Sequence, residues 1–312
     1  MFDSVNFRLT QAEVSGVDFL SETPCYLNEV AEHQFSSGLV AVTGKTGGLK
    51  VSINRFQVKV CDGSLCKWYL GNNYQTMGRR DTQMAIEKLS DTLHLPMGKA
   101  AVYRLDIAQN FICKHPPEIY INHLGMLRNA TRLLNDGSVY YKRAGNVLCF
   151  YDKNREQKRK REAVPELYED RNVLRYEQRY TQHLARQLKV SEVTGALLYD
   201  VTFYVDLINR WHDTYRNILK INDISLNFQA MKTKQELYRM GVLSLIERAG
   251  GQMELIDQIN EAQKRGELTN KQAYDLRQAI KDAGKVRNGF TVANDAIQEL
   301  DRKVKEAVMY YR

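Results

Sequence analysis

Apolar and polar residues alternate along much of the first two thirds of the chain, which is typical of β-strands with one face in a core. In the strand predicted at 100–111, for example, the polar residues Arg104 and Asp106 flank the apolar Leu105. Strands are also expected at 48–60, 64–71, 138–142, 146–153 and 172–180. Apolar residues spaced three or four apart predict helices at 79–95 and 118–134 instead. The combination indicates an α+β domain.

From about residue 194 the pattern becomes helical. Helices are predicted at 196–219, 232–249, 253–266, 269–284 and 294–311, with Thr269 as a capping residue. We therefore expect an α+β domain over residues 1–200, with a central antiparallel sheet and helices packed on one face. An all-helical C-terminal domain is expected over residues 201–312.

The composition is that of an ordinary globular protein, with 43% hydrophobic and 26% charged residues among 312. The sequence contains no apolar run long enough for a membrane helix, and it begins without a signal-peptide pattern. A cytoplasmic protein without a membrane partner is expected. The five cysteines contain no CxxC pair, which argues against a zinc knuckle or a disulfide scaffold.

The formal net charge of +8 is concentrated in the middle of the chain. Between Arg128 and Lys189 there are 15 lysines and arginines against 8 aspartates and glutamates, a surplus of 15 − 8 = 7. A concentrated positive field favours binding to a polyanion, because neutralising phosphates releases counterions. The basic run 153–162 is equally compatible with a solvated charged helix.

Three of the predicted strands carry ionisable groups on one face, because side chains alternate across a strand. These faces hold Arg104, Asp106, Ala108 and Asn110 on 102–111; Val147, Cys149, Tyr151 and Lys153 on 147–153; and Arg175, Glu177 and Arg179 on 173–179. If the three strands are neighbours, two carboxylates and a phenol meet several cations on one sheet surface.

Such a surface suits phosphodiester chemistry. Two carboxylates can hold a divalent metal, which polarises phosphate oxygens. A tyrosine can attack phosphorus when nearby positive charge or a base activates it. Ordinary solvated residues paired as Arg with Glu across a wet sheet face explain the same pattern, and the faces alone favour that plainer interpretation.

Four segments in order, at 63–77, 102–111, 146–156 and 172–180, resemble motifs of the rolling-circle replication initiators of the gene II and gene X type from filamentous phages and their relatives in plasmids. The segment 267–284 is similar to a helical region near the C-terminus of that family, so the resemblance spans roughly residues 50–285. It implies a protein that nicks one strand of a double-stranded origin with a tyrosine. Such proteins stay attached to the 5′ phosphate, leave a 3′ hydroxyl for a polymerase and later rejoin the displaced strand.

The resemblance also implies residue roles and a divalent metal, magnesium or manganese. Tyr151 corresponds to the nucleophile with Lys153 beside it, and Asp106 and Glu177 correspond to metal ligands. Together with the basic residues around them, the candidates for DNA contacts are Arg104, Arg175, Arg179, Lys67, Lys158, Arg159, Lys160 and Arg161.

Two features of the site stay open at this point. The His-x-His metal motif of other rolling-circle nucleases is absent from the sequence, so carboxylates must hold the metal, and magnesium or manganese is favoured over zinc. Candidates for a third ligand are Asp152, Glu156, Asn110 and His33. Candidates for a second tyrosine are Tyr140, Tyr141, Tyr176 and Tyr180, of which Tyr176 is expected to face the core.

Two other segments allow two interpretations each. Trp68, beside Lys67, can stack on an unpaired base or lie in the core at the end of a strand, and the second is slightly favoured. The basic residues of the C-terminal helices can dock in a DNA groove or form a solvated face. The loop 42–50 lacks the spacing of a phosphate-binding loop, which argues against an ATPase.

The expected function is rolling-circle initiation through a tyrosine nickase. Its expected partners are duplex origin DNA, single-stranded DNA, and host helicase and polymerase, with a homodimer as a further expectation. The alternatives are a relaxase that mobilises an integrative element and a non-catalytic DNA-binding regulator.

Overall fold

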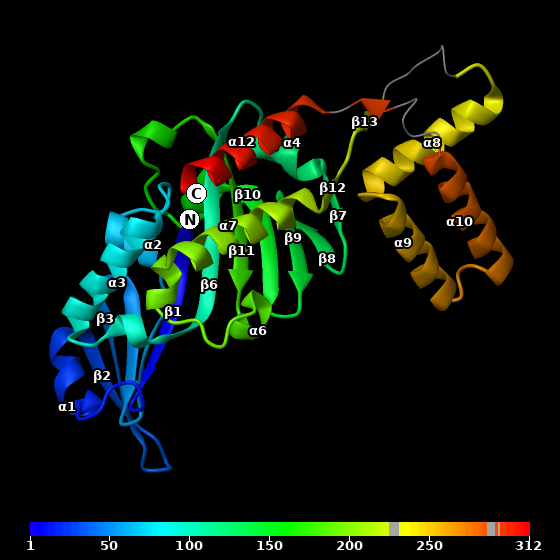
Figure 1. The fold of residues 1–312 in the computed structure, drawn as a ribbon. Helices are drawn as coiled ribbons and strands as arrows, with labels where there is room; N and C mark the ends of the chain where they lie inside the picture. Colours follow the sequence, from blue (N-terminus) through cyan, green and yellow to red (C-terminus); the bar gives the residue numbers. More distant parts are fainter. Residues whose placement is uncertain (225–230, 286–290, 293) are drawn as a thin grey trace.

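The computed structural model describes residues 1–224, 231–285, 291–292 and 294–312 (Figure 1). Its strands are β1 (Phe2–Thr10), β2 (Asn28–Gln34), β3 (Val40–Thr46), β4 (Leu49–Asn54), β5 (Gln57–Cys61), β6 (Ala101–Cys113), β7 (Leu124–Leu127), β8 (Thr131–Asn135), β9 (Ser138–Arg143), β10 (Asn146–Asp152), β11 (Asn172–Tyr180), β12 (Ile218–Lys220), β13 (Asp223–Ile224) and β14 (Thr291–Val292). Ten of them form one antiparallel sheet in the order β2-β3-β4-β5-β1-β6-β11-β10-β9-β8. The strands β12 and β7 pair separately, as do β13 and β14.

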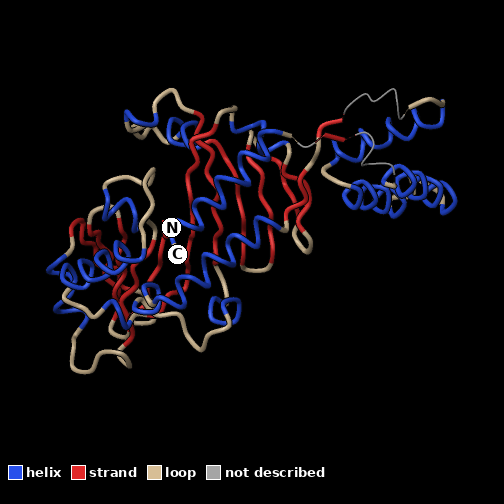
Figure 2. Tube along the Cα trace, turned by 45° about the horizontal axis from the view of Figure 1, so that its top comes forward, coloured by secondary structure: helices blue, strands red, loops and turns tan. Residues whose placement is uncertain are grey.

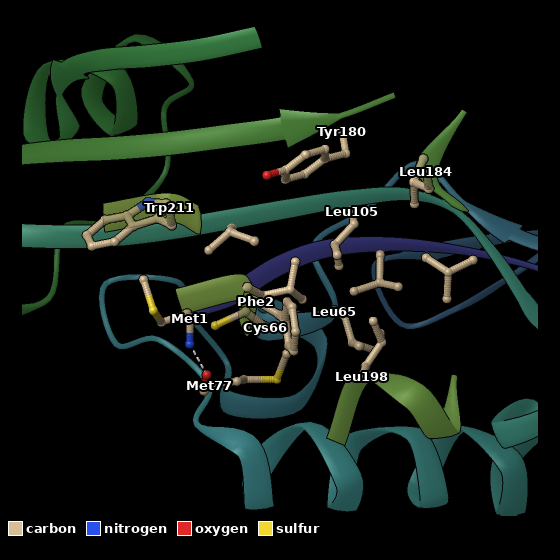
Figure 3. Packing of buried hydrophobic residues seen from close by; sticks show 14 of the residues in the cluster. Met1, Phe2, Leu65, Cys66, Met77, Leu105, Tyr180, Leu184, Leu198 and Trp211 are labelled. Atoms are coloured by element: carbon tan, nitrogen blue, oxygen red, sulfur yellow. Dashed lines mark hydrogen bonds between the residues drawn. The ribbon is translucent and has the colours of Figure 1, made fainter. Parts of the chain in front are cut away.

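The helices are α1 (Phe19–Glu22), α2 (Leu65–Leu70), α3 (Arg79–Leu93), α4 (Pro117–Asn122), α5 (Lys153–Arg159), α6 (Leu184–Leu188), α7 (Val201–Arg216), α8 (Lys234–Ala249), α9 (Gln252–Lys264), α10 (Asn270–Gly284) and α12 (Asp295–Tyr311). Figure 2 shows α7 and α12 lying across one face of the sheet. In the core beneath them, Trp211 of α7 lies in one cluster with Phe2 of β1 and Leu105 of β6 (Figure 3). The predicted α+β fold with a central antiparallel sheet and C-terminal helices is confirmed.

The helices after residue 200 fall into two groups. Trp211 of α7 and Leu300 of α12 belong to the same hydrophobic core as the sheet. Ile246 of α8 and Ile280 of α10 form a second, small core with Ala283. The boundary expected at residue 200 therefore does not separate two cores, because the apolar faces of α7 and α12 are buried against the sheet while α8–α10 pack on each other. Among the described helices, none has the length and apolar character needed to span a membrane.

The helix predicted at 118–134 is wrong beyond its first turns. The segment instead forms α4, β7 and β8. Asn129 adopts a left-handed backbone with φ 58°, which interrupts a helix. Gly125 approaches the backbone of the α8–α9 junction, where the Met126 N–H donates to the Gly250 carbonyl at 2.9 Å. A tertiary contact has overridden the helical spacing.

The strand predicted at 64–71 is the helix α2. Its ends are capped at both sides: Ser64 Oγ accepts a hydrogen bond from the Lys67 N–H at 3.0 Å, and Gly71 ends the helix with φ 82°. Trp68 is half-buried at the edge of the core rather than inside it. The segment 48–60 is the hairpin β4–β5, since Asn54 Oδ1 accepts from the N–H groups of Phe56 and Gln57 in its turn.

Candidate functional site

The three strands expected to carry the site are neighbours. Strand β11 lies between β10 and β6, antiparallel to both. The pairing creates three rows across the sheet: Tyr151–Arg175–Asn110, Cys149–Glu177–Ala108 and Val147–Arg179–Asp106. Because directly opposite residues point to the same face, the predicted gathering of the phenol, the carboxylates and the arginines is confirmed by the register.

A cleft of about 700 Å³ opens over this face. It runs between β1 and α2 on one side and β9, β10 and α5 on the other. The predicted site residues among its lining are Tyr151, Lys153, Asp106, Glu177, Arg104, Arg179, Lys67, Arg159 and Lys160. The cleft therefore brings together nine of the twelve predicted site residues.

Tyr151 is half-buried in the cleft. Its hydroxyl donates a hydrogen bond to Glu177 Oε2 at 3.0 Å. Burial raises the pKa of this phenol well above its ordinary value, and the nearby Arg175 only partly opposes the effect. Tyr151 is therefore a protonated phenol whose hydrogen is directed at a carboxylate.

Glu177 is held as a carboxylate by two arginines. It is 3% exposed, and it accepts hydrogen bonds from Arg179 Nε at 3.1 Å and Nη2 at 3.2 Å. Burial alone would raise the pKa of Glu177, but Arg175 and Arg179 outweigh it and lower the pKa to about 2. Glu177 is consequently ionised at neutral pH.

Asp106 lies in the same row as Arg179 and is 1% exposed. It accepts from Arg104 Nε at 3.1 Å and Nη2 at 2.7 Å. Burial raises the pKa of Asp106 to about 6, and the negative charge of Glu177 adds to this, although Arg104 opposes both. The two carboxylates thus act on each other electrostatically, and at Asp106 the effect of burial outweighs that of Arg104.

Lys153 is not on the wet sheet surface that its strand position predicted. It is the first residue of α5 and is 1% exposed. Its ammonium donates to Glu156 Oε2 at 2.8 Å and to Gln157 Oε1 at 3.0 Å. Burial and the charge of Arg175 lower the pKa of Lys153. The helix start set by Asp152, whose side chain accepts from the Arg155 N–H, turns Lys153 inward.

Three predicted DNA contacts lie elsewhere. Arg175 is 0% exposed, so it has no surface with which to reach DNA. Lys158 lines a separate pocket of about 320 Å³, and Arg161 is not among the described residues that line the main cleft. The helix α5 projects the side chains of the basic run in several directions, and only part of the run faces the cleft.

The cations at the mouth of the cleft are already paired with acidic side chains. Lys67 of α2 bridges to Glu162, and Lys160 bridges to Glu156. Across the cleft, Arg159 lies 3.9 Å from a carboxylate oxygen of Asp136 in the β8–β9 turn. Phosphate groups entering the cleft must compete with these carboxylates.

Asp3 and Asn73 are among the cleft residues that the sequence did not indicate. Asp3 comes from β1, and Asn73 from the loop after α2. By alternation Asp3 shares the apolar face of Val5, Phe7 and Leu9, so splitting the segment 2–10 into faces does not place it in the cleft. Asn73 lies in a loop that carries no periodic pattern.

The candidates for a third metal ligand lie in different parts of the structure. Asp152 and Glu156 line the cleft, whereas His33 lies on the edge strand β2 and contacts Thr43 at 3.0 Å. The Asn110 amide donates to the carbonyls of Asn73 and Tyr74.

The four tyrosine candidates also differ in position. Tyr140 lies opposite Cys149 and lines the cleft. Tyr141, Tyr176 and Tyr180 are buried, and Tyr176 faces the core as predicted.

A hard divalent cation in the cleft would need the carboxylates of Asp106 and Glu177, whose oxygens accept hydrogen bonds from Arg104 and Arg179 in this structure. In the part of the chain that the structure describes, no group of three His, Cys, Asp or Glu side chains is arranged to hold a metal. Magnesium sites commonly use one or two carboxylates and complete their shell with substrate phosphates and water. Burial raises the pKa of Asp106 to about 6, and a cation bound there would favour its ionised form.

Comparison with known proteins places the chain in a family. None of the curated proteins matches it. The family model for the N-terminal region of the phage replication-associated protein of the gene II type matches residues 1–199, which include every strand and helix that lines the cleft. The predicted membership in the phage replication initiators is confirmed there, and the similarity noted at 267–284 lies outside the matched region. The chain belongs to the family of the gene II replication-associated protein and carries its N-terminal region at residues 1–199.

Proposed function

We propose that the protein initiates rolling-circle replication by nicking and rejoining DNA through a covalent 5′-phosphotyrosine at Tyr151. Family membership supports replication initiation. The observation that carries the chemistry is the Tyr151 hydroxyl, 3.0 Å from the ionised Glu177 at the floor of a cleft with a cationic mouth.

In the proposed step, the Tyr151 oxygen attacks a phosphorus of the DNA backbone. The bond from tyrosine oxygen to phosphorus forms as the bond from phosphorus to the 3′ oxygen breaks. The DNA 5′ phosphate remains on the protein, the Tyr151 phenol loses its proton, and the 3′ oxygen leaves and takes up one proton in exchange. The reverse attack by a 3′ hydroxyl rejoins the strand without an external energy source, since one phosphodiester replaces another.

The residues around Tyr151 have different roles in the proposed reaction. Glu177 accepts the hydrogen bond that orients the phenol, while Arg104 and Arg179 lie where they can contact phosphate oxygens. Lys153, two residues after Tyr151, supplies buried positive charge to the lining of the cleft. A bound magnesium or manganese ion, held by Asp106 and Glu177, would polarise the phosphate oxygens.

The proposed replication cycle requires DNA substrates and host proteins as partners. Duplex origin DNA is the first substrate and the displaced single strand the second. The free 3′ hydroxyl requires a host polymerase, and strand displacement requires a helicase. A cytoplasmic site of action and a homodimer belong to the same proposal.

A covalent-capture assay tests the function. The protein and manganese are incubated with labelled origin DNA from its own element, and products are separated on a denaturing gel. Labelled protein that disappears in Tyr151→Phe and weakens in Asp106→Ala supports the proposal. Intact DNA binding without any covalent product would favour a non-catalytic regulator. A nick at a transfer origin rather than a replication origin would favour a relaxase with the same chemistry.

A further inference from the structure

Arg175 is a fully buried cation at the centre of the site. Its guanidinium donates to Asp3 Oδ2 at 2.6 Å, to Asn110 Oδ1 at 3.1 Å and to the Asn73 carbonyl at 3.1 Å. Burying a charge is costly unless it is paired and hydrogen-bonded. Three hydrogen-bond acceptors therefore hold this guanidinium in one orientation.

The partner that neutralises Arg175 comes from a distant strand. Asp3 lies on β1, and β6 separates that strand from β11. The β1–β6 register shifts between Phe2 and Val5, and such irregularities redirect side chains. Asp3 Oδ1 is fixed in turn by Ser64 Oγ at 2.5 Å and by the Asn73 amide at 3.2 Å. Asp3 is therefore held rigidly against the Nη2 group of Arg175.

Arg175 interacts with Glu177, the partner of the Tyr151 hydroxyl, through its positive charge. Its Nε lies 3.5 Å from Glu177 Oε2 and makes no hydrogen bond among the described residues. That same oxygen accepts the Tyr151 hydroxyl at 3.0 Å. Arg175 also lies directly opposite Tyr151 in the β10–β11 pairing. The guanidinium thus places its positive charge beside Glu177 Oε2, the oxygen that orients the Tyr151 hydroxyl.

We infer that Asp3 and Arg175 form a buried positioning pair that fixes Glu177 and the Tyr151 hydroxyl for attack, and that Arg175 does not contact DNA. The inference rests on the function proposed above. It predicts that the pair affects the rate of strand cleavage and leaves DNA affinity unchanged. The reason is that Arg175 has no exposed surface, and that Asp3 is committed to Arg175, Ser64 and Asn73.

The test replaces the ion pair by a neutral pair. Asp3→Asn/Arg175→Gln removes both charges together, which avoids leaving one buried charge alone. Single-turnover cleavage and equilibrium binding are measured on one oligonucleotide that contains the nick site mapped with the wild-type protein. Thermal unfolding reports the fold. The matched control is Asp206→Asn/Arg210→Gln, which removes the ion pair on α7 outside the cleft.

Cleavage by the folded double variant is expected to fall about 10- to 100-fold, as for losses of residues that orient a reactive group, with an unchanged Kd. The control should keep the wild-type rate. A double variant that folds and cleaves like the wild type would overturn the inference, and so would an increased Kd with an unchanged cleavage rate.

Arg175→Lys provides a second test that keeps the charge. It preserves the ion pair with Asp3 but removes the Nε that faces Glu177. We expect slower cleavage with normal binding, whereas a purely structural ion pair predicts a wild-type rate. If the wild-type protein forms no covalent product, the function proposed above fails. If the wild type cleaves DNA and the variants cleave equally fast, only the positioning pair fails.

Discussion

The rings of Phe150 and Tyr176 stack at 4.4 Å, with their planes 5° apart, on the face of the sheet opposite the cleft. Tyr176 stacks in turn on Trp211 of α7 at 4.5 Å, and its hydroxyl donates to the Trp211 carbonyl at 3.0 Å. This column ties β10 and β11 to α7. Tyr151 and Glu177, each the next residue along its strand, therefore project from a rigid base.

Tyr176→Phe is expected to lower the free energy of unfolding by about 1 kcal/mol, because it removes the hydrogen bond from the tyrosine hydroxyl to the Trp211 carbonyl. Covalent capture of DNA should be unaffected, since the Tyr176 hydroxyl is buried on the far face of the sheet. Chemical denaturation and the capture assay check the two expectations. Loss of the covalent product in a stably folded Tyr176→Phe protein would contradict this placement.

The basic run should contribute unequally to DNA binding. Arg159 lines the cleft, and Arg161 is not among the described residues that do. Arg159→Gln is therefore expected to weaken binding similarly for all sequences and to reduce the slope of log K against log salt by about 1. Arg161→Gln is the matched control and should change neither quantity. Equal effects of both substitutions would show that DNA follows a path outside the cleft.

The ion pair between Lys67 and Glu162 is expected to compete with DNA. Glu162→Gln releases Lys67 for phosphate and should tighten binding of an oligonucleotide at low salt. An unscreened contact of this kind is worth up to about 1 kcal/mol, or several-fold in Kd. The gain should disappear in the Lys67→Gln background. Binding that is unchanged in Glu162→Gln would mean that Lys67 lies off the DNA path.

The strand faces of the site were predictable because alternation depends only on local sequence. Asp106 and Glu177 occupy polar positions of strands whose other positions are apolar, so their shared face could be predicted once the strands were assumed to be neighbours. The role of Asp3 could not, because it requires β1 to lie beside β6 with a shifted register. Arg175 looked like a surface residue because its partners come from other strands and loops.

Two elements were misassigned for opposite reasons. The segment 64–71 is aromatic and strand-like in composition, but the caps at Ser64 and Gly71 close a helix. The segment 118–134 has helical spacing, but Asn129 and the contact between Gly125 and the α8–α9 junction divide it. Local caps decided the first case and tertiary packing the second.

Glu299 of α12 should make the docking of this helix sensitive to acid. Burial would raise the pKa of Glu299, but the hydrogen bond from Tyr120, the Lys114 N–H and Lys303 outweigh it and lower the pKa below its usual value. The stabilisation is therefore fully present above the carboxyl's unfolded pKa and is lost as the pH falls through the lower, folded value.

Glu299→Gln is expected to lower the free energy of unfolding at pH 7 by about 1–3 kcal/mol. The difference from the wild type should begin to shrink as the pH falls below the ordinary glutamate pKa of about 4.3, where the unfolded carboxyl takes up a proton, and should vanish once the folded carboxyl is protonated at its lower pKa. Denaturant unfolding at several pH values measures this. A difference that stays constant through the acidic range would contradict the assigned charge of Glu299.

The most direct test of the central claim is the identity of the residue that becomes covalently linked to DNA. The product formed with manganese and origin DNA is digested with nuclease and protease, and the modified peptide is sequenced by mass spectrometry. We predict a nucleotide phosphate on Tyr151 and no covalent product from Tyr151→Phe. A modification on Tyr140 or any other tyrosine, retained in Tyr151→Phe, would contradict the assignment of Tyr151 as the nucleophile.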